Sequence, residues 1–250
     1  MLTRENYFDK ENELKYFGSS QFKSFMKCEA STMARINGET EEETSTALLV
    51  GSYVDAHFEG TLDLFMAQHP EILKRDGSLK AEYTQANEII NRLERDEMFM
   101  KYMSGEKQVI MTAELFGHEF KIRIDSYHEG KAIVDLKVMR DFEPVYVEEL
   151  GRVSFVEAWG YDIQGAIYQA VVEASTGKRL PFIIAGATKQ KDGADLGLFQ
   201  VPQYKLDAAL KIVEHYVDHF ADIKSVLIAP KWSDKCAFGK QKKNISRIEV

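Results

Sequence analysis

The clearest alternation of hydrophobic and polar residues along the chain lies between residues 121 and 137, KIRIDSYHEGKAIVDLK. Ile122 and Ile124 alternate with charged residues, which is typical of a half-buried strand. A polar, glycine-containing turn follows, and residues 132–137 then form a β-branched, apolar run. The pattern predicts two strands, 121–127 and 132–137, joined by a short turn.

Other segments show either the helical period of 3.6 or the strand period of two. Helices are expected over 17–28, 44–68 (one or two helices), 70–104, 153–176 and 203–229, and further strand segments over 108–116, 118–127, 181–190 and 195–201. A loop is expected over 141–151. Together these elements predict an α/β fold, with a central mixed sheet of about five strands flanked by helices and a helical N-terminal part.

The second predicted strand ends in Asp135-Leu136-Lys137. Side chains two residues apart in a strand point to the same face, so Asp135 and Lys137 lie together and Leu136 points away. If the two strands pair across the turn, Asp125 lies beside Asp135. Two neighbouring carboxylates repel unless a cation joins them, which favours a hard divalent metal with oxygen ligands. The alternative is a solvated hairpin with an incidental salt bridge, because an Asp-x-Lys triplet is common by chance.

The wider pattern resembles a known family. Asp125, nine residues, Asp135-Leu136-Lys137 and then a helix with Gln164 and Tyr168 is similar to the PD-(D/E)xK nuclease superfamily. The segments IVDLK and WGYDIQGAIYQAV look most like those of RecE-type 5′→3′ exonucleases of phage and prophage, and more distantly like lambda exonuclease. The resemblance covers roughly residues 45–200, with a weaker match at 17–28. The chain departs from the superfamily pattern in having Arg123-Ile124 where a proline can precede the first aspartate.

The resemblance implies roles for individual residues. Asp125, Asp135 and the Leu136 carbonyl would hold Mg²⁺, for which Mn²⁺ could substitute, and Lys137 would position and activate the attacking water. Further residues could contribute metal ligands (His57, Glu114), orient the water (Gln164) or contact DNA (Tyr168, Arg123). A core role remains the alternative for His57, Gln164 and Tyr168, and a one-residue slip in register would turn Glu114 away.

The helix expected after Gly18 could also meet DNA. Ser19 or Ser20 is a candidate N-cap, and Lys23 lies one turn further on. Free N–H groups at a helix start together with a lysine could bind the 5′-phosphate of a DNA end. The alternative is an ordinary capped helix packed on the core.

Composition sets limits on the function. The 250 residues fit one nuclease domain over 17–230 (core about 105–202), an arm over 1–16 and a basic tail over 231–250. Two cysteines cannot hold a four-cysteine iron–sulfur cluster, and the chain contains no GxxxxGK[ST] phosphate loop. No apolar run is long enough to cross a membrane, so we expect a cytoplasmic protein. The net charge of −8 argues only weakly against DNA, because local basic groups govern that affinity.

The function expected from the resemblance is a Mg²⁺-dependent 5′→3′ exodeoxyribonuclease. It would degrade one strand at the ends of double-stranded DNA and leave 3′ overhangs for recombination by strand annealing. The resemblance also implies a ring-shaped homo-oligomer, a tetramer rather than a trimer, and a RecT-type single-strand annealing partner. The alternatives are an endonuclease with the same site, an inactive DNA-binding descendant, and a metal hydrolase acting on small phosphoesters.

Overall fold

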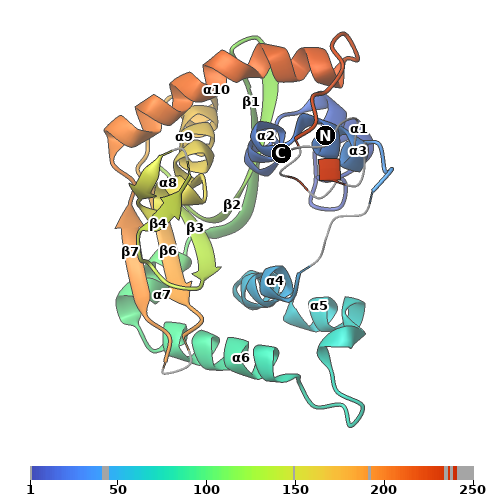
Figure 1. Ribbon diagram of the computed structural model, residues 1–250. Helices are drawn as coiled ribbons and strands as arrows, with labels where there is room; N and C mark the ends of the chain where they lie inside the picture. Colours follow the sequence, from blue (N-terminus) through green and yellow to red (C-terminus); the bar gives the residue numbers. More distant parts are fainter. Residues whose placement is uncertain are drawn as a thin grey trace.

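A computed structural model gives the structure of the chain and describes residues 2–40, 45–148, 150–190, 193–233, 236 and 239–240. Figure 1 shows the arrangement of its helices and strands. The helices are α1 (Lys10–Lys15), α2 (Ser19–Lys27), α3 (Glu29–Ile36), α4 (Thr46–Glu59), α5 (Leu62–Gln68), the 3₁₀ helix η1 (Pro70–Ile72), α6 (Ala81–Glu94), α7 (Glu97–Met103), α8 (Phe155–Ala158), α9 (Tyr161–Thr176) and α10 (Gln203–Lys224). The strands are β1 (Glu106–Leu115), β2 (His118–His128), β3 (Ala132–Met139), β4 (Val145–Val147), β5 (Gly151–Val153), β6 (Phe182–Thr188) and β7 (Leu196–Gln200).

The predicted five-stranded mixed sheet is confirmed. Its strand order is β1-β2-β3-β6-β7, in which β3 and β6 run parallel and the other neighbours run antiparallel. The parallel pair is joined by the crossover that carries α8 and α9, as a parallel connection requires. The loop expected over 141–151 is not entirely irregular, because β4 and β5 form a small antiparallel hairpin next to α8.

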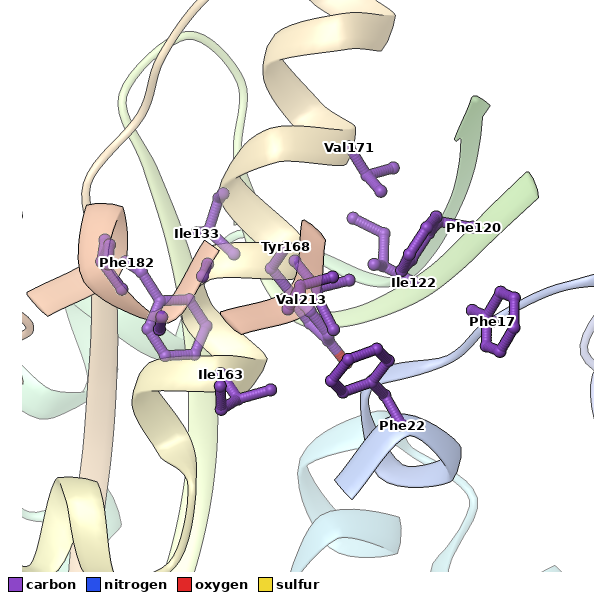
Figure 2. Close-up of a cluster of buried hydrophobic side chains, with 14 of the residues drawn as sticks. Phe17, Phe22, Phe120, Ile122, Ile133, Ile163, Tyr168, Val171, Phe182 and Val213 are labelled. Atoms are coloured by element: carbon purple, nitrogen blue, oxygen red, sulfur yellow. The ribbon is translucent and has the colours of Figure 1, made fainter. Parts of the chain in front are cut away.

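Each face of the sheet is covered by helices. On one face, Ile133, Phe182 and Ile184 pack against α2, α3, α9 and α10. On the other, Val134, Ile183 and Ala185 pack against α4, α6 and α7. Figure 2 shows part of the first cluster, where Ile163, Tyr168 and Val171 of α9 lie among side chains from the strands and the N-terminal segment. Alternation along β3 and β6 therefore divides the apolar residues between two cores.

The helix predicted over 153–176 is broken into α8 and α9. Ser154 caps α8 in a capping box with Glu157, and Gly160 then adopts φ 62°, which ends the first helix and begins the second. Gly165 lets α9 lie close to the sheet, because a Cβ there would come within 2.5 Å of the Phe182 ring. The start of α2 also differs from the prediction, since Gly18 is the N-cap and neither Ser19 nor Ser20 caps the helix.

The segment that follows α10 packs against α3, in the N-terminal part of the chain. The backbone of Ala30 donates to the carbonyl of Lys231, and Lys231 N–H donates to Glu29 Oε2 at 2.8 Å. The Sγ atoms of Cys28 and Cys236 lie 2.8 Å apart, within hydrogen-bond distance. Most of the predicted basic tail, including residues 241–250, lies outside the described residues. Among the helices described, none combines the length and apolar character needed to span a membrane.

Candidate active site

The β2–β3 hairpin brings the two predicted carboxylates together. Ser126 pairs with Val134, and the next position in this register puts Asp125 opposite Asp135. The backbone ladder ends there, and the Asp125 side chain takes its place by accepting a 2.8 Å hydrogen bond at Oδ2 from the Leu136 N–H. Asp125 therefore holds the start of the Asp135-Leu136-Lys137 segment in place.

The Lys137 ammonium group contacts the oxygen atoms that the family resemblance assigns to a metal. Its Nζ forms an ion pair with Asp135 Oδ2 and donates to the Leu136 carbonyl at 3.2 Å. Asp135 is 2% exposed, and Oδ2 accepts no hydrogen bond of good geometry, so the ammonium is the charge that compensates it. Burial alone would lower the pKa of Lys137, but the charges of Asp135 and Asp125 outweigh it and raise that pKa above its usual value.

Helix α9 contributes the residue that holds the other oxygen of Asp135. Gln164 Nε2 donates to Asp135 Oδ1 at 2.7 Å, and it can reach this atom because Gly165 allows close packing of α9. In this geometry Gln164 orients the carboxylate rather than a water or a phosphate. Tyr168 is buried, and its hydroxyl donates to the Arg123 carbonyl at 2.8 Å. The structure thus places Tyr168 behind strand β2, not on a surface that DNA could contact.

A third carboxylate, that of Asp55 on α4, also belongs to this group. Burial raises the pKa of Asp55 well above its usual value, and the nearby charges of Asp125 and Asp135 raise it further. Burial likewise raises the pKa of Asp125 to about 7, with Asp135 adding to the rise. Sequence reasoning missed Asp55, although an acid within the apolar segment TALLVGSYVDAHFE was a visible signal.

Gln108 on β1 is a second residue that the sequence did not reveal. It lies at the register position opposite Asp125, between the pairs Lys107–Ser126 and Val109–Ile124. Its backbone has φ 55°, in the left-handed region, and its Nε2 donates to Asp125 Oδ1 at 3.2 Å. Its Oε1 is buried and accepts no hydrogen bond. A strained residue beside a carboxylate group is typical of a functional site.

Two predicted ligands are not brought to this group. His57 lies two residues after Asp55 on α4, hence on a different side of the helix, and its Nε2 lies 2.8 Å from Glu94 Oε1. Glu114 is exposed and pairs with Glu119 near the far end of β1. It lies six residues from Gln108, or about 20 Å along a strand. The prediction failed for Glu114 because the hairpin register selects Gln108 as the neighbour of Asp125.

Basic and aromatic side chains lie on the α2 side of the site. The ammonium groups of Lys23 and Lys137 lie 5.5 and 5.6 Å from the centre of the Tyr161 ring. Burial, together with the Lys137 charge, lowers the pKa of Lys23 to about 8. Of the two serines that begin α2, Ser19 is buried and Ser20 is exposed. Lys23 is thus the residue of the predicted phosphate-binding set that reaches the carboxylates.

On the α4 side a cavity of about 200 Å³ opens beside the site. Asp55, Glu59 and Arg123 contribute to its lining, together with Ser52, Ala56, Thr61, Leu64, Phe65 and Gln68. The cluster of carboxylates formed by Asp55, Asp125 and Asp135 is therefore flanked by Lys23 on one side and by Arg123 on the other.

The oxygen atoms at the site can be compared with those that a divalent metal requires. Within the described ranges, no set of three or more His, Cys, Asp or Glu side chains is arranged as a ready-made metal cage. Mg²⁺ is commonly held by only one or two carboxylates with water and phosphate oxygens, so this does not conflict with the donor set of Asp125, Asp135 and the Leu136 carbonyl. The Lys137 ammonium already rests on Asp135 Oδ2 and the Leu136 carbonyl oxygen, which shows that these atoms attract a cation. The residues fit a hard divalent cation.

Comparison with known proteins identifies the family. Residues 18–242 match the model of a PDDEXK-like domain of unknown function, DUF3799. The chain belongs to this family. The resemblance of the chain to the PD-(D/E)xK nuclease superfamily is thereby confirmed.

This PDDEXK-like protein is also similar to solved structures. The crystal structure of a candidate exonuclease from Eubacterium rectale is 46% identical, covers 100% of this chain and 96% of its own, and has a TM-score of 0.95. A crystal structure of SSO0001 is 15% identical over 80% of this chain and 84% of its own, with a TM-score of 0.31, which is too low to support an argument. No match was found among curated proteins.

Proposed function

We propose that this PDDEXK-like protein is a metal-dependent nuclease that degrades linear double-stranded DNA from its ends in the 5′→3′ direction. The observation that carries the proposal is the group formed by Asp125, Asp135 and Lys137, in which the lysine ammonium rests on two oxygen atoms suited to a metal. The 46% identical candidate exonuclease supports an exonuclease rather than an endonuclease.

Asp125, Asp135 and the Leu136 carbonyl would hold Mg²⁺ or Mn²⁺, with Asp55 as a further carboxylate close by. Such an ion, when bound, polarises a phosphoryl oxygen and lowers the pKa of water. A bound cation would also lower the pKa of Asp125 toward its ordinary range, because it would offset the repulsion from Asp135 that contributes to the raised pKa.

The chain's own residues would perform the remaining steps. Lys137, displaced from Asp135, would hold the attacking water and stabilise the negative charge that develops on the phosphate. Gln164 and Gln108 would keep the two carboxylates oriented through the hydrogen bonds at Asp135 Oδ1 and Asp125 Oδ1. Lys23, stacked on Tyr161, would bind the DNA backbone on the α2 side.

The biological setting belongs to the same proposal. A 5′→3′ exonuclease leaves 3′ single strands, which suits recombination by annealing with a RecT-type partner. An enzyme that stays on one DNA end gains by enclosing it, so a ring of several copies, with a tetramer favoured over a trimer, would serve this activity.

The test is digestion of a linear duplex labelled at either end, with Mg²⁺, with and without a 5′-phosphate. We expect label to be released first from the 5′ end, and Asp135→Asn protein to release none. Earlier release from the 3′ end would contradict the polarity. Cleavage of covalently closed circles would point to an endonuclease, and turnover of a chromogenic phosphodiester without digestion of DNA would point to a small-molecule hydrolase.

A further inference from the structure

Arg123 lines the cavity on the α4 side of the site but its charge is not used there. It lies two residues before Asp125 on β2, and both alternate with Ile122 and Ile124, which point into the core. Within the described ranges, no hydrogen bond or ion pair involves its guanidinium group, although Asp55 and Glu59 line the same cavity.

The N-terminal arm holds this guanidinium group in place. The Cζ atom of Arg123 lies 5.6 Å from the ring centre of Tyr7 and 5.4 Å from that of Phe8. The strand below is fixed as well, because the Tyr168 hydroxyl donates to the Arg123 carbonyl. A long side chain that packs against two neighbouring rings, on a strand whose backbone is fixed, has already lost much of its conformational freedom, which lowers the entropic cost of binding.

The arm itself is anchored by a buried lysine. Lys121 Nζ donates to the Tyr7 carbonyl and lies 4.5 Å from the centre of the Tyr7 ring. It also forms a 2.8 Å ion pair with Glu13 of α1. Tyr7 is 7% exposed, whereas Phe8 is 63% exposed. Tyr7 is therefore part of the core, and Phe8 covers the guanidinium group from the solvent side.

A planar guanidinium group with unused donors matches a phosphate, which it binds through two parallel hydrogen bonds. Two residues along a strand correspond to about 7 Å, so Arg123 is close to the phosphate that would lie at Asp125 but separate from it. We propose that Arg123 binds the phosphate next to the one being cleaved, and that Tyr7 and Phe8 are positioning residues for it. This inference rests on the proposed nuclease function.

The experiment compares wild-type protein with Arg123→Ala, Arg123→Lys and Phe8→Ala, and uses the exposed Arg75→Ala as the matched control. Binding of a fluorescent duplex with a 5′-phosphate is measured by anisotropy in Ca²⁺ over a salt series. Digestion of the same duplex is measured in Mg²⁺. Circular dichroism and thermal melting confirm that each variant is folded.

Arg123→Ala is expected to raise KM about tenfold with a much smaller change in kcat, because this contact forms in both the ground state and the transition state. It should also reduce the slope of log K against log salt by about 0.9. Arg123→Lys should restore the salt slope but not the full affinity. Phe8→Ala should raise KM while leaving the salt slope unchanged, since the charge remains.

An unchanged KM and salt slope in Arg123→Ala, with an active wild-type protein, would overturn this inference and leave the nuclease function standing. Equal effects in Arg75→Ala would also overturn it, because the contribution would then be general charge. A wild-type protein that neither binds nor digests the duplex would overturn the proposed function and this inference with it.

Discussion

This protein contains two groups of buried charges that differ in how completely their polar atoms are hydrogen-bonded. Under the N-terminal arm, Lys121 pairs with Glu13, and Lys224 donates to the Tyr16 carbonyl and to Gln21 Oε1. Gln21 in turn donates to both the carbonyl and the carboxylate of Glu13. At the candidate site, by contrast, Asp135 Oδ2 and Gln108 Oε1 are buried without hydrogen bonds. The polar atoms of the first group bind one another. The second group leaves oxygen atoms that could bind a metal ion or a substrate.

This difference separates charges that stabilise a fold from charges that serve a reaction. A buried ion pair with complete hydrogen bonding resists disruption, because removing one partner leaves the other charge uncompensated. Carboxylates that crowd one another have raised pKa values and cost stability until a cation joins them. Each of the following substitutions tests this difference.

The largest expected effect is on catalysis. Lys137→Ala removes the ammonium that compensates Asp135 and that would stabilise the developing charge, so kcat for linear DNA should fall by about 10²–10³. Initial rates on a labelled duplex measure this. The control is Lys205→Ala, which removes a lysine that pairs with Glu157 and does not belong to the cluster of Asp55, Asp125 and Asp135. Undiminished digestion by Lys137→Ala would contradict the catalytic role proposed for Lys137.

Disruption of the arm should affect stability most. Glu13→Gln leaves Lys121 buried without its carboxylate, so the free energy of unfolding should fall by about 3–5 kcal/mol. Urea denaturation measures the change. The protein that remains folded should keep its kcat, because Glu13 does not contact the carboxylates of the site. A stability unchanged within about 0.5 kcal/mol would show that the arm charges contribute little.

Asp125→Asn should have the opposite effect on stability in metal-free buffer. The folded protein raises the pKa of Asp125 from 3.8 to about 7, so the folded state holds this proton more tightly than the unfolded state. The associated stability is present below about pH 4 and is lost as the pH rises through 7. The variant should therefore be more stable than wild type at neutral pH, by on the order of 1–3 kcal/mol, and the difference should vanish near pH 4.

Denaturation over that pH range, with and without Mg²⁺, measures this difference. Metal should stabilise wild type more than Asp125→Asn. A variant less stable than wild type at neutral pH would show that Asp125 is charged at no cost in the folded protein.

The smallest effect compares two residues on α4. Asp55→Ala should lower kcat/KM about tenfold, because Asp55 interacts with Asp125 and Asp135. His57→Ala should change it less than about threefold, because its partner is Glu94 at the surface, and exposed pairs contribute little. Steady-state rates on the same duplex measure both. A larger loss for His57 would support the ligand role that the sequence suggested.

Local pattern alone was enough to predict much of this molecule. The alternation over 121–137 determined the hairpin, and its turn determined the register that sets Asp125 beside Asp135. The glycines at 160 and 177 illustrate the limit of such reasoning, since Gly177 ends α9 as expected but Gly160 divides a helix that looked continuous. Both adopt positive φ, which favours glycine, and a Cβ at Gly160 would also lie 2.9 Å from Lys23 Cδ.

The tertiary structure alone decided which distant residues complete the site. Asp55 and Gln108 come from a helix and a strand, and their places at the site depend on how α4 and β1 pack beside β2. The same packing brought Cys28 next to Cys236. Periodicity records which face of an element is apolar, and it carries no information about which residues of another element lie opposite. Strand order, register and helix packing supply that information, because they follow from contacts between segments far apart in the chain.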